Sequence, residues 1–481
     1  MILEQADTTR RDAIVGAMVS RMATQPTEKI RHRDIALDSH LPEEVVRGYF
    51  PQISDLTLAT LRHCEAELGV SIPHRFPDLL SGAAAQFRRS AERPEEAAAR
   101  QAPVRPQMLV EFTEPLRSAV RELLAGEAGH VGRSRLDLDR AAAVITFVAS
   151  PACWSGLRKL GLEHREMAGL VTWLLETMHR ALPAGPVDAD AGNASRLTGV
   201  RGRLLATPAN PRDTRERALV AAVARLAKDP WRLPTHAELQ QDTGISERTL
   251  WRRFPTRDAL RAAISNWYTE QVACPHELTD VWDLIAWMPQ HFARMDANPQ
   301  VALSMIGTRS AWEIRLAGRD QRFAEMERLL APHLEGAGLS THRAEAVVRL
   351  AYVLRALRAW TVLCGTFGMP GTEAGHAVGW ALACMVRRLD ADPGSLAAAF
   401  AVTEGAASVD ELRHRVLAPL RAARGDLEAQ GPQLEALAGR DPVDDARLRL
   451  EAAVEALEEL VRGAAAGADR RRRAEWAGDP D

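Results

Sequence analysis

The stretch "TGISERTLWRRFPTRDAL", residues 243–260, has the pattern of a glycine turn followed by a short helix. Gly244 tolerates the left-handed backbone that such a turn needs. Ser246 is a typical N-cap for the helix that follows. Leu250 and Phe254 are four residues apart, so they are expected to share the buried face of that helix. The pattern therefore predicts a helix whose other faces are open to a partner.

The open faces of this helix are basic and aromatic. Thr235 is expected to cap a preceding helix that runs through Gln241. A helix, a glycine turn and a short helix predict a helix-turn-helix, whose second helix enters the major groove of DNA. Arginine on that helix binds guanine edges, and helix N-termini bind phosphates. The candidate DNA contacts here are Thr235, His236, Ser246, Arg248, Thr249, Trp251, Arg252 and Arg257.

A more acidic version of the pattern, "SHLPEEVVRGYFPQISDL", occupies residues 39–56, which begin 204 residues earlier. A Phe-Pro step, a turn and several apolar positions coincide in one register, with Phe50 opposite Phe254. The preceding helices are aligned with Thr9 opposite Thr214, which requires a slip of one residue in the following loop. We interpret this agreement as an internal duplication.

The two copies differ in charge where they are expected to face DNA. Residues 27–56 carry four cations and six acids, whereas residues 230–262 carry six cations and four acids. Gly48 also stands where the second copy has Arg252. Because phosphate contacts dominate the affinity for nucleic acid, carboxylates on the reading helix weaken binding. The candidate DNA contacts of the first copy are Arg31, Arg33, Arg47 and Tyr49. We expect two unequal heads, with the second carrying most of the recognition.

The second copy resembles the DNA-binding domain of the tetracycline-repressor (TetR) family of transcriptional regulators. Its apolar first helix, its "TGIS" turn (243–246) and its "TLWRRF" ending (249–254) match the pattern of that family. Trp251 stands where the family usually has tyrosine, and Arg257 stands at the position of a phosphate-binding lysine. The resemblance covers residues 214–260 closely and the following helices more loosely. It implies that each head is followed by a helical ligand-binding and dimerisation bundle.

The chain as a whole is predicted to be all-α, because helix-forming residues dominate and apolar residues recur with helical spacing. Two stretches rich in proline, glycine and charge, 90–107 and 182–202, predict a long loop and an interdomain linker. The predicted domains are a first helix-turn-helix domain at 1–65, a first helical regulatory domain at 66–182, a linker at 183–212, a second helix-turn-helix domain at 213–268, a second ligand-binding and dimerisation domain at 269–400, and a C-terminal helical extension with a basic tail at 401–481.

The second regulatory region is the richer in large apolar side chains. Mostly apolar pockets suit drug-sized ligands, although methionine and aromatic residues at helical spacing fit an ordinary core equally well. The candidate ligand-binding residues are Trp287, His291, Phe292, Met295, Met305, Trp312, Trp360 and Phe367. The helices expected at 342–365 and 372–390 resemble the dimer-interface pair of the family. If 136–150 and 163–182 form an equivalent pair, one chain makes an intramolecular pseudo-dimer; a homodimer is the alternative.

Composition narrows the class of protein further. The 481-residue chain has a net charge of −3, and its five cysteines show no CxxC spacing, which favours a reducing compartment over disulfides or structural zinc. An apolar signal-peptide core and a membrane-length apolar run are both missing, so we expect a cytoplasmic protein without a membrane partner. Common catalytic and phosphate-binding motifs are also missing, so neither an enzyme nor a metal or cofactor is expected.

The sequence thus predicts a transcriptional regulator, specifically a repressor that releases a double-stranded DNA operator when a small-molecule effector binds. The alternative is a protein-interaction or scaffold module in which the first head binds protein and DNA binding is partial or absent. Charge reversal of Arg248 separates the two, because operator binding that survives it unchanged would mean that the reading helix is placed wrongly.

Overall fold

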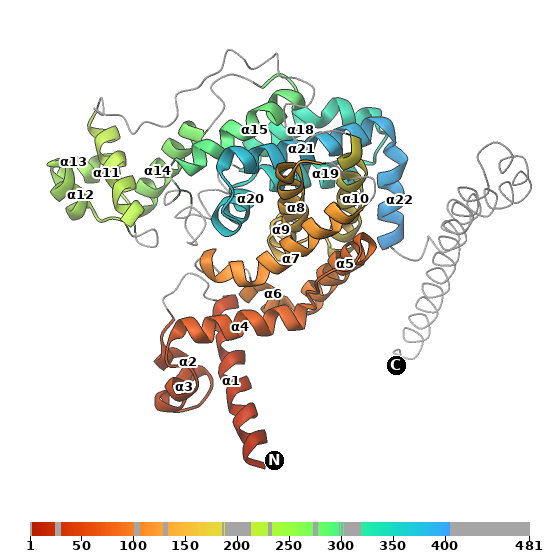
Figure 1. The fold of residues 1–481 in the computed structure, drawn as a ribbon. Coiled ribbons are helices and arrows are strands. Elements are labelled where there is room, and N and C mark those ends of the chain that lie inside the picture. Colours follow the sequence, from red (N-terminus) through yellow and green to blue (C-terminus); the bar gives the residue numbers. More distant parts are fainter. Residues whose placement is uncertain are drawn as a thin grey trace, which may run out of the picture. The chain divides into compact units, whose positions relative to one another are not determined.

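All regular elements in the described part of the computed structural model are helices, which confirms the predicted all-α class (Figure 1). The described residues are 2–24, 30–100, 106–127, 133–184, 187, 213–228, 233–272, 278–297, 299, 302 and 319–404. The chain divides into two compact units, Met1–Pro393 and Gly394–Asp481. None of the described helices combines the length and the apolar character needed to cross a membrane.

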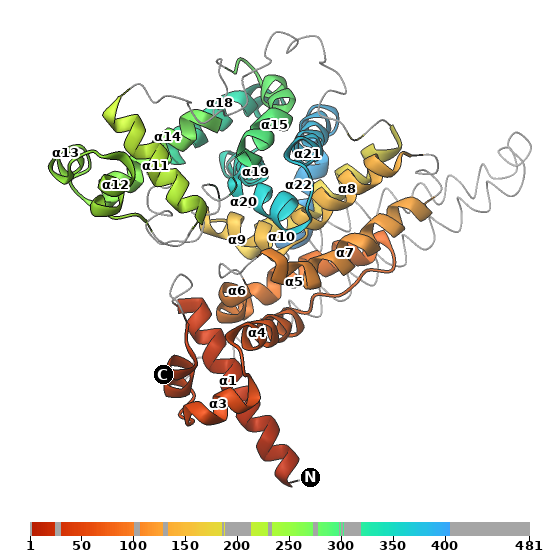
Figure 2. The ribbon, with the colours of Figure 1, turned by 60° about the vertical axis from the view of Figure 1, so that its left-hand side comes forward.

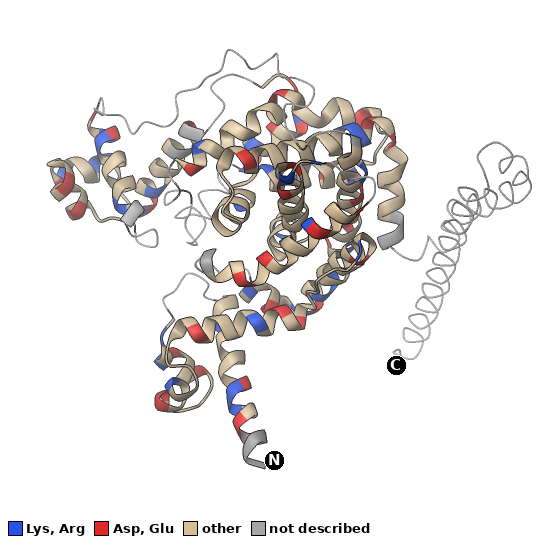
Figure 3. Ribbon diagram, viewed as in Figure 1, with Lys and Arg blue, Asp and Glu red and all other residues tan. Residues whose placement is uncertain are grey.

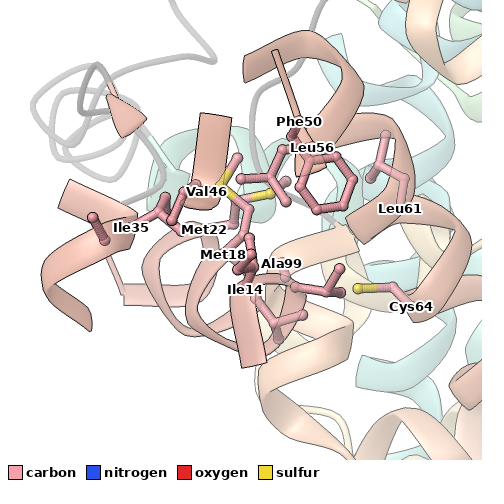
Figure 4. Packing of buried hydrophobic residues seen from close by; sticks show 13 residues of the cluster. Ile14, Met18, Met22, Ile35, Val46, Phe50, Leu56, Leu61, Cys64 and Ala99 are labelled. Carbon is pink, nitrogen blue, oxygen red and sulfur yellow. The ribbon is translucent and has the colours of Figure 1, made fainter. Parts of the chain in front are cut away.

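Four helices form the first head. They are α1 (Ile2–Thr24), α2 (His32–Asp38), α3 (Glu43–Tyr49) and α4 (Ile53–Leu68). Their apolar faces meet in one buried cluster that extends from Ile14 on α1 to Leu61 on α4 (Figure 4). Burial of each large side chain contributes about 1.5–3 kcal/mol, so this cluster holds the short α2 and α3 in place. Ala99 belongs to the same cluster, so the core of the head continues beyond its own four helices.

The second head repeats this arrangement of helices. It consists of α11 (Thr214–Lys228), α12 (His236–Thr243), α13 (Glu247–Arg253) and α14 (Arg257–Val272). A spacing of 204 residues relates the two heads. It separates the end of α1 from the end of α11, and it separates both the first and the last residues of α3 from those of α13 and of α4 from those of α14. This common spacing supports the interpretation of an internal duplication.

The predicted one-residue slip between the heads is wrong, because the first helices follow the same spacing of 204. The slipped alignment pairs Ala13 with Ala218, but Ala13 is exposed and Ala218 is fully buried. At a spacing of 204, Ile14 replaces Ala13 as the partner of Ala218, and both are fully buried. The first helix has two adjacent apolar columns, so a shift by one residue still places apolar residues opposite each other.

The first regulatory region contains α5 (Phe76–Glu92), α6 (Pro94–Arg100), α7 (Pro106–Gly126), α8 (Arg135–Val148), α9 (Pro151–Lys159), α10 (His164–Ala181) and the short 3₁₀-helix η2 (Leu182–Ala184). The predicted loop at 90–107 is wrong, because it contains α6 and the ends of its neighbours. Pro94 opens α6 at a position where a helix needs no N–H, and Glu95 and Glu96 favour its N-terminus. The predicted linker lies outside the described residues apart from 182–184 and 187.

The second regulatory region contains α15 (Val281–Asp296), α18 (Arg319–Gly336), α19 (Thr341–Arg355), α20 (Leu357–Trp360), the π-helix η3 (Thr361–Thr366) and α21 (Gly371–Ala391). The single helix predicted at 342–365 is wrong. Ala356 interrupts it with an extended backbone, φ −72° and ψ 159°. Neither proline nor glycine marks this break, so composition alone predicted continuity.

The second unit begins with most of α22 (Pro393–Glu404). The remainder of the predicted C-terminal extension and its basic tail lies outside the described residues.

Helices of the two regulatory regions pack directly on each other, and α8 and α10 lie beside α21 in both views (Figures 1 and 2). The guanidinium of Arg140 on α8 binds Glu373 on α21 at 2.7 Å and the carbonyl of Val187 at 2.8 Å. A second contact has the acid in the first region and the base in the second: Glu166 on α10 contacts the imidazole of His342 on α19. The interface between the two regulatory regions therefore lies within a single chain.

Candidate nucleic-acid interface

The helix-turn-helix of the second head has the local geometry that the sequence predicts. The Thr235 hydroxyl accepts a hydrogen bond from the backbone N–H of Glu238 at 3.2 Å, which caps α12. Gly244 has a φ of +70°, so the turn uses the left-handed conformation. Ser246 caps α13 by accepting from the N–H of Thr249 at 3.4 Å. These contacts fix the start of each helix and confirm the predicted caps.

The outward surface of α13 is basic. Arg248, Arg252 and Arg253 are exposed, and none has a carboxylate partner within the described residues. Trp251 is 49% exposed between them, whereas Leu250 is buried beneath the helix. Figure 3 marks the charged residues along this head. Arg248, Trp251 and Arg252 are predicted DNA contacts, whereas Arg253 is an exposed cation outside the predicted set.

Three other predicted contacts already have partners inside the head. The Ser246 and Thr249 hydroxyls lie 3.0 Å apart and bond to each other. Arg257 is exposed and donates to the carbonyl of Leu233 at 2.9 Å. The bond to Leu233 therefore already orients the Arg257 side chain before any phosphate binds.

His236, a predicted DNA contact, is buried in the second head rather than exposed on its surface. It is 7% exposed, and its Nε2 lies 2.9 Å from the carbonyl oxygen of Phe254 at the end of α13. Its ring also stacks on Trp251, with 4.1 Å between ring centroids and 29° between planes. The first residue of α12 thus points into the head rather than toward a partner.

The first head repeats the internal contacts of the second. His32 is 7% exposed and makes the same bond, at 2.8 Å, to the phenylalanine carbonyl 18 residues later. Arg21 on α1 binds Asp38 on α2 through two hydrogen bonds of 2.7 and 2.9 Å. Arg225 and Asp242 form the equivalent pair in the second head. The bond to Asp242 raises the pKa of Arg225 above its ordinary value.

The turn of the first head is also left-handed, although it lacks glycine. His40 occupies the position equivalent to Gly244 and has a φ of +56°. A side chain costs about 1–2 kcal/mol in this conformation. The rest of the head therefore forces the turn that glycine adopts freely in the second head.

The outward surface of α3 differs sharply from that of α13. Arg47 is held by Glu43 on the same helix, with bonds of 2.9 and 2.7 Å to one carboxylate oxygen. The Tyr49 hydroxyl donates to Asp7, and this bond raises the pKa of the phenol. Gly48 offers no side chain. Binding DNA through Arg47 or Tyr49 would first require breaking these contacts.

Two of the predicted contacts of the first head lie on α2 and just before it. Arg31 and Arg33 are exposed, and Arg33 lies 3.7 Å from Asp34. The backbone N–H of Arg31 bonds to the same carboxylate at 2.9 Å. Arg31 and Arg33 are therefore exposed cations that could contact DNA next to the acidic α3.

The candidate ligand-binding residues are core residues wherever the structure describes them. The buried members are Trp287, His291, Phe292, Met295, Trp360 and Phe367, while Met305 and Trp312 lie outside the described residues. The Trp360 indole donates to Asp296 at 2.8 Å, and Arg117 lies over the ring of Phe367 at 5.2 Å. Burial fits both an ordinary core and the lining of an apolar ligand pocket, so the ligand-binding assignment of these residues stays a prediction.

Asp296 joins three elements, although no sequence motif marks it. One carboxylate oxygen accepts from Trp360 on α20, and the other accepts from the backbone N–H of Gly371 at 2.5 Å. Burial, together with the nearby Asp296 carboxylate, raises the pKa of the Cys364 thiol on η3. The last residue of α15 is thereby tied to the start of α21.

The structural roles of the two histidines and of the Arg–Asp pairs are likewise not among the predictions from sequence. Their signal was available, because His32 and His236 are 204 positions apart, as are Arg21 and Arg225.

No protein-family model matches the chain, and a search of curated proteins finds no match.

Proposed function

We propose that the chain is a DNA-binding transcriptional regulator that reads duplex DNA mainly through α13. The main support is that three arginines on α13 are exposed and have no carboxylate partner within the described ranges: Arg248, Arg252 and Arg253. Such side chains reach phosphates and guanine edges without breaking an ion pair. In the first head, by contrast, Arg47 is already bound by Glu43. The two heads are therefore proposed to contribute unequally.

One chain is proposed to carry both heads as an intramolecular pseudo-dimer. The support is the packing of α8 and α10 against helices of the second regulatory region, including α21, together with the bond from Arg140 to Glu373. Close approach elsewhere in the interface adds support, because a Cβ at Gly156 would lie 3.0 Å from Val353. Linking two binding modules raises the effective concentration of the second, even when it binds weakly.

Regulation is proposed to follow the repressor pattern, in which a small-molecule effector favours a conformation with low affinity for DNA. The second regulatory region supports this, because α15 carries the buried Trp287, Phe292 and Met295 and ends at Asp296. Asp296 is bonded to Gly371 at the start of α21, so a displacement of α15 reaches the interface helix directly.

The test begins with selection of bound duplexes from a random pool by the full chain, followed by affinity measurements at several salt concentrations. The variant Arg248→Glu/Arg252→Glu is expected to bind the selected duplex at least about 30-fold more weakly, the scale of two lost base or phosphate contacts. Its salt dependence should also become shallower, by a slope of about 2. The matched control is Arg47→Glu on α3, for which we expect less than about a twofold change.

Unchanged affinity in the double variant would show that α13 does not read DNA. If the pool yields no enriched duplex at all, the DNA-binding proposal is wrong and the scaffold alternative gains support.

A further inference from the structure

The end of α13 is held by a contact that appears in both heads. Phe254 is the last residue before Pro255, and its carbonyl follows the final helical turn, where carbonyls lack helical partners. Nε2 of His236 lies 2.9 Å from this oxygen. A carbonyl oxygen only accepts, so His236 must donate. His32 makes the equivalent bond in the first head, so this bond by itself belongs to the shared scaffold.

A second contact of His236 is specific to the second head. Its ring stacks on the Trp251 indole with 4.1 Å between centroids and 29° between planes. In the first head, the position equivalent to Trp251 is Arg47, whose guanidinium bonds to Glu43 instead. The stack is therefore an addition to the scaffold bond, present only where the outward surface is basic.

Stacking fixes the orientation of an otherwise open side chain. Trp251 is 49% exposed, while the histidine beneath it is 7% exposed and anchored to the backbone. Trp251 lies between Arg248 and Arg252 on α13, so its free face belongs to the proposed reading surface. An indole held in one orientation offers an apolar face to thymine methyl groups and loses little conformational entropy on binding.

We propose that His236 is a positioning residue for DNA recognition, acting through the stacked ring of Trp251. This inference rests on the proposed DNA-binding function. It predicts that His236 and Trp251 contribute to specific affinity as one unit, whereas His32, which has the same backbone bond but no stacked indole, contributes nothing to it.

The test is a double-mutant cycle on affinity for the selected duplex, using the full chain. His236→Gln removes the ring but keeps an amide donor, and Trp251→Ala removes the indole. Each is expected to weaken binding about fivefold, the scale of one aromatic pair. The double variant is expected to be no weaker than Trp251→Ala alone. Affinity for an unselected duplex should change less than about twofold in all variants, because phosphate contacts remain.

Two further variants separate positioning from folding. His236→Phe retains a stacking ring but loses the donor to the Phe254 carbonyl, so it is expected to weaken binding less than His236→Gln does. His32→Gln is the matched control in the first head and should leave specific affinity unchanged. As a readout that does not use DNA, the ¹⁹F resonance of 5-fluorotryptophan at position 251, assigned with Trp251→Phe, should shift in His236→Gln but not in His32→Gln.

Additive losses in the double variant, or losses in His236→Phe as large as in His236→Gln, would overturn the inference and leave the DNA-binding proposal standing. Failure of the wild-type chain to enrich any duplex would overturn both.

Discussion

The close packing of α21 against α15 depends on two glycines of α21, Gly371 and Gly375, and it can be tested by adding a side chain at one of them. A Cβ at Gly375 would lie 2.4 Å from the carbonyl oxygen of Met288 and 2.4 Å from Cα of Pro289. Both contacts are about 1 Å inside ordinary van der Waals distance. Both neighbours are backbone atoms, so no side-chain rotation relieves the clash. Gly375→Ala must therefore push the two helices apart.

The expected cost follows from two opposing effects. Overpacking in a core costs about 1–3 kcal/mol, and two backbone clashes place Gly375→Ala near the upper end. Replacing a helical glycine by alanine stabilises the helix by about 1 kcal/mol, which offsets part of this cost. We therefore expect the free energy of unfolding to fall by about 2 kcal/mol. At a denaturant dependence of about 2 kcal/mol per molar, the urea midpoint falls by about 1 M.

Urea unfolding followed by circular dichroism measures this shift, with Gly16→Ala as the matched control. Gly16 lies within α1, and nothing lies within 4 Å of a Cβ built there. Gly16→Ala should therefore gain about 0.5–1 kcal/mol from helix propensity alone. A midpoint for Gly375→Ala equal to or above that of the wild type would refute the close approach of α15 and α21.

Other predictions concern the interface and the turns. Arg140→Ala leaves Glu373 without its buried guanidinium and should lower the free energy of unfolding by about 2–3 kcal/mol. Replacing the exposed Arg135, which lies 3.9 Å from Asp139, by alanine should lower the free energy of unfolding by less than about 0.5 kcal/mol. Urea midpoints check both, and equal effects would contradict the burial argument. His40→Gly should stabilise the first head by about 1 kcal/mol, and Gly244→Ala should destabilise the second by a similar amount. Hydrogen exchange of the neighbouring helices measures these changes, and the reverse sign at either turn would contradict the strain assigned to it.

The local features of the second head could be predicted from sequence because each depends on a few neighbouring residues. A cap at Thr235, a left-handed glycine at Gly244 and a cap at Ser246 are chemical preferences of single side chains. The inward direction of His236 depends instead on a carbonyl 18 residues away. A polar residue at the start of a helix gives no sign of such a distant partner.

Long-range packing explains the other differences. The break at Ala356 follows no helix-breaking residue, and α6 forms in a segment whose proline and charges suggested a loop. The register between the heads was missed for a related reason. An apolar column on a helix is similar to its neighbour, and only burial in three dimensions separates Ala13 from Ile14.

Because the two regulatory regions share one chain, a substitution at their interface falls on one side only. In a homodimer the same change would appear twice, and both sides would remain identical. Here Glu373 meets the guanidinium of Arg140, while Glu166 meets the imidazole of His342. The first cation is permanent, and the second exists only when the ring is protonated. A fused chain can therefore give the two ends of one interface different chemistry, a freedom that symmetry denies to a pair of identical subunits.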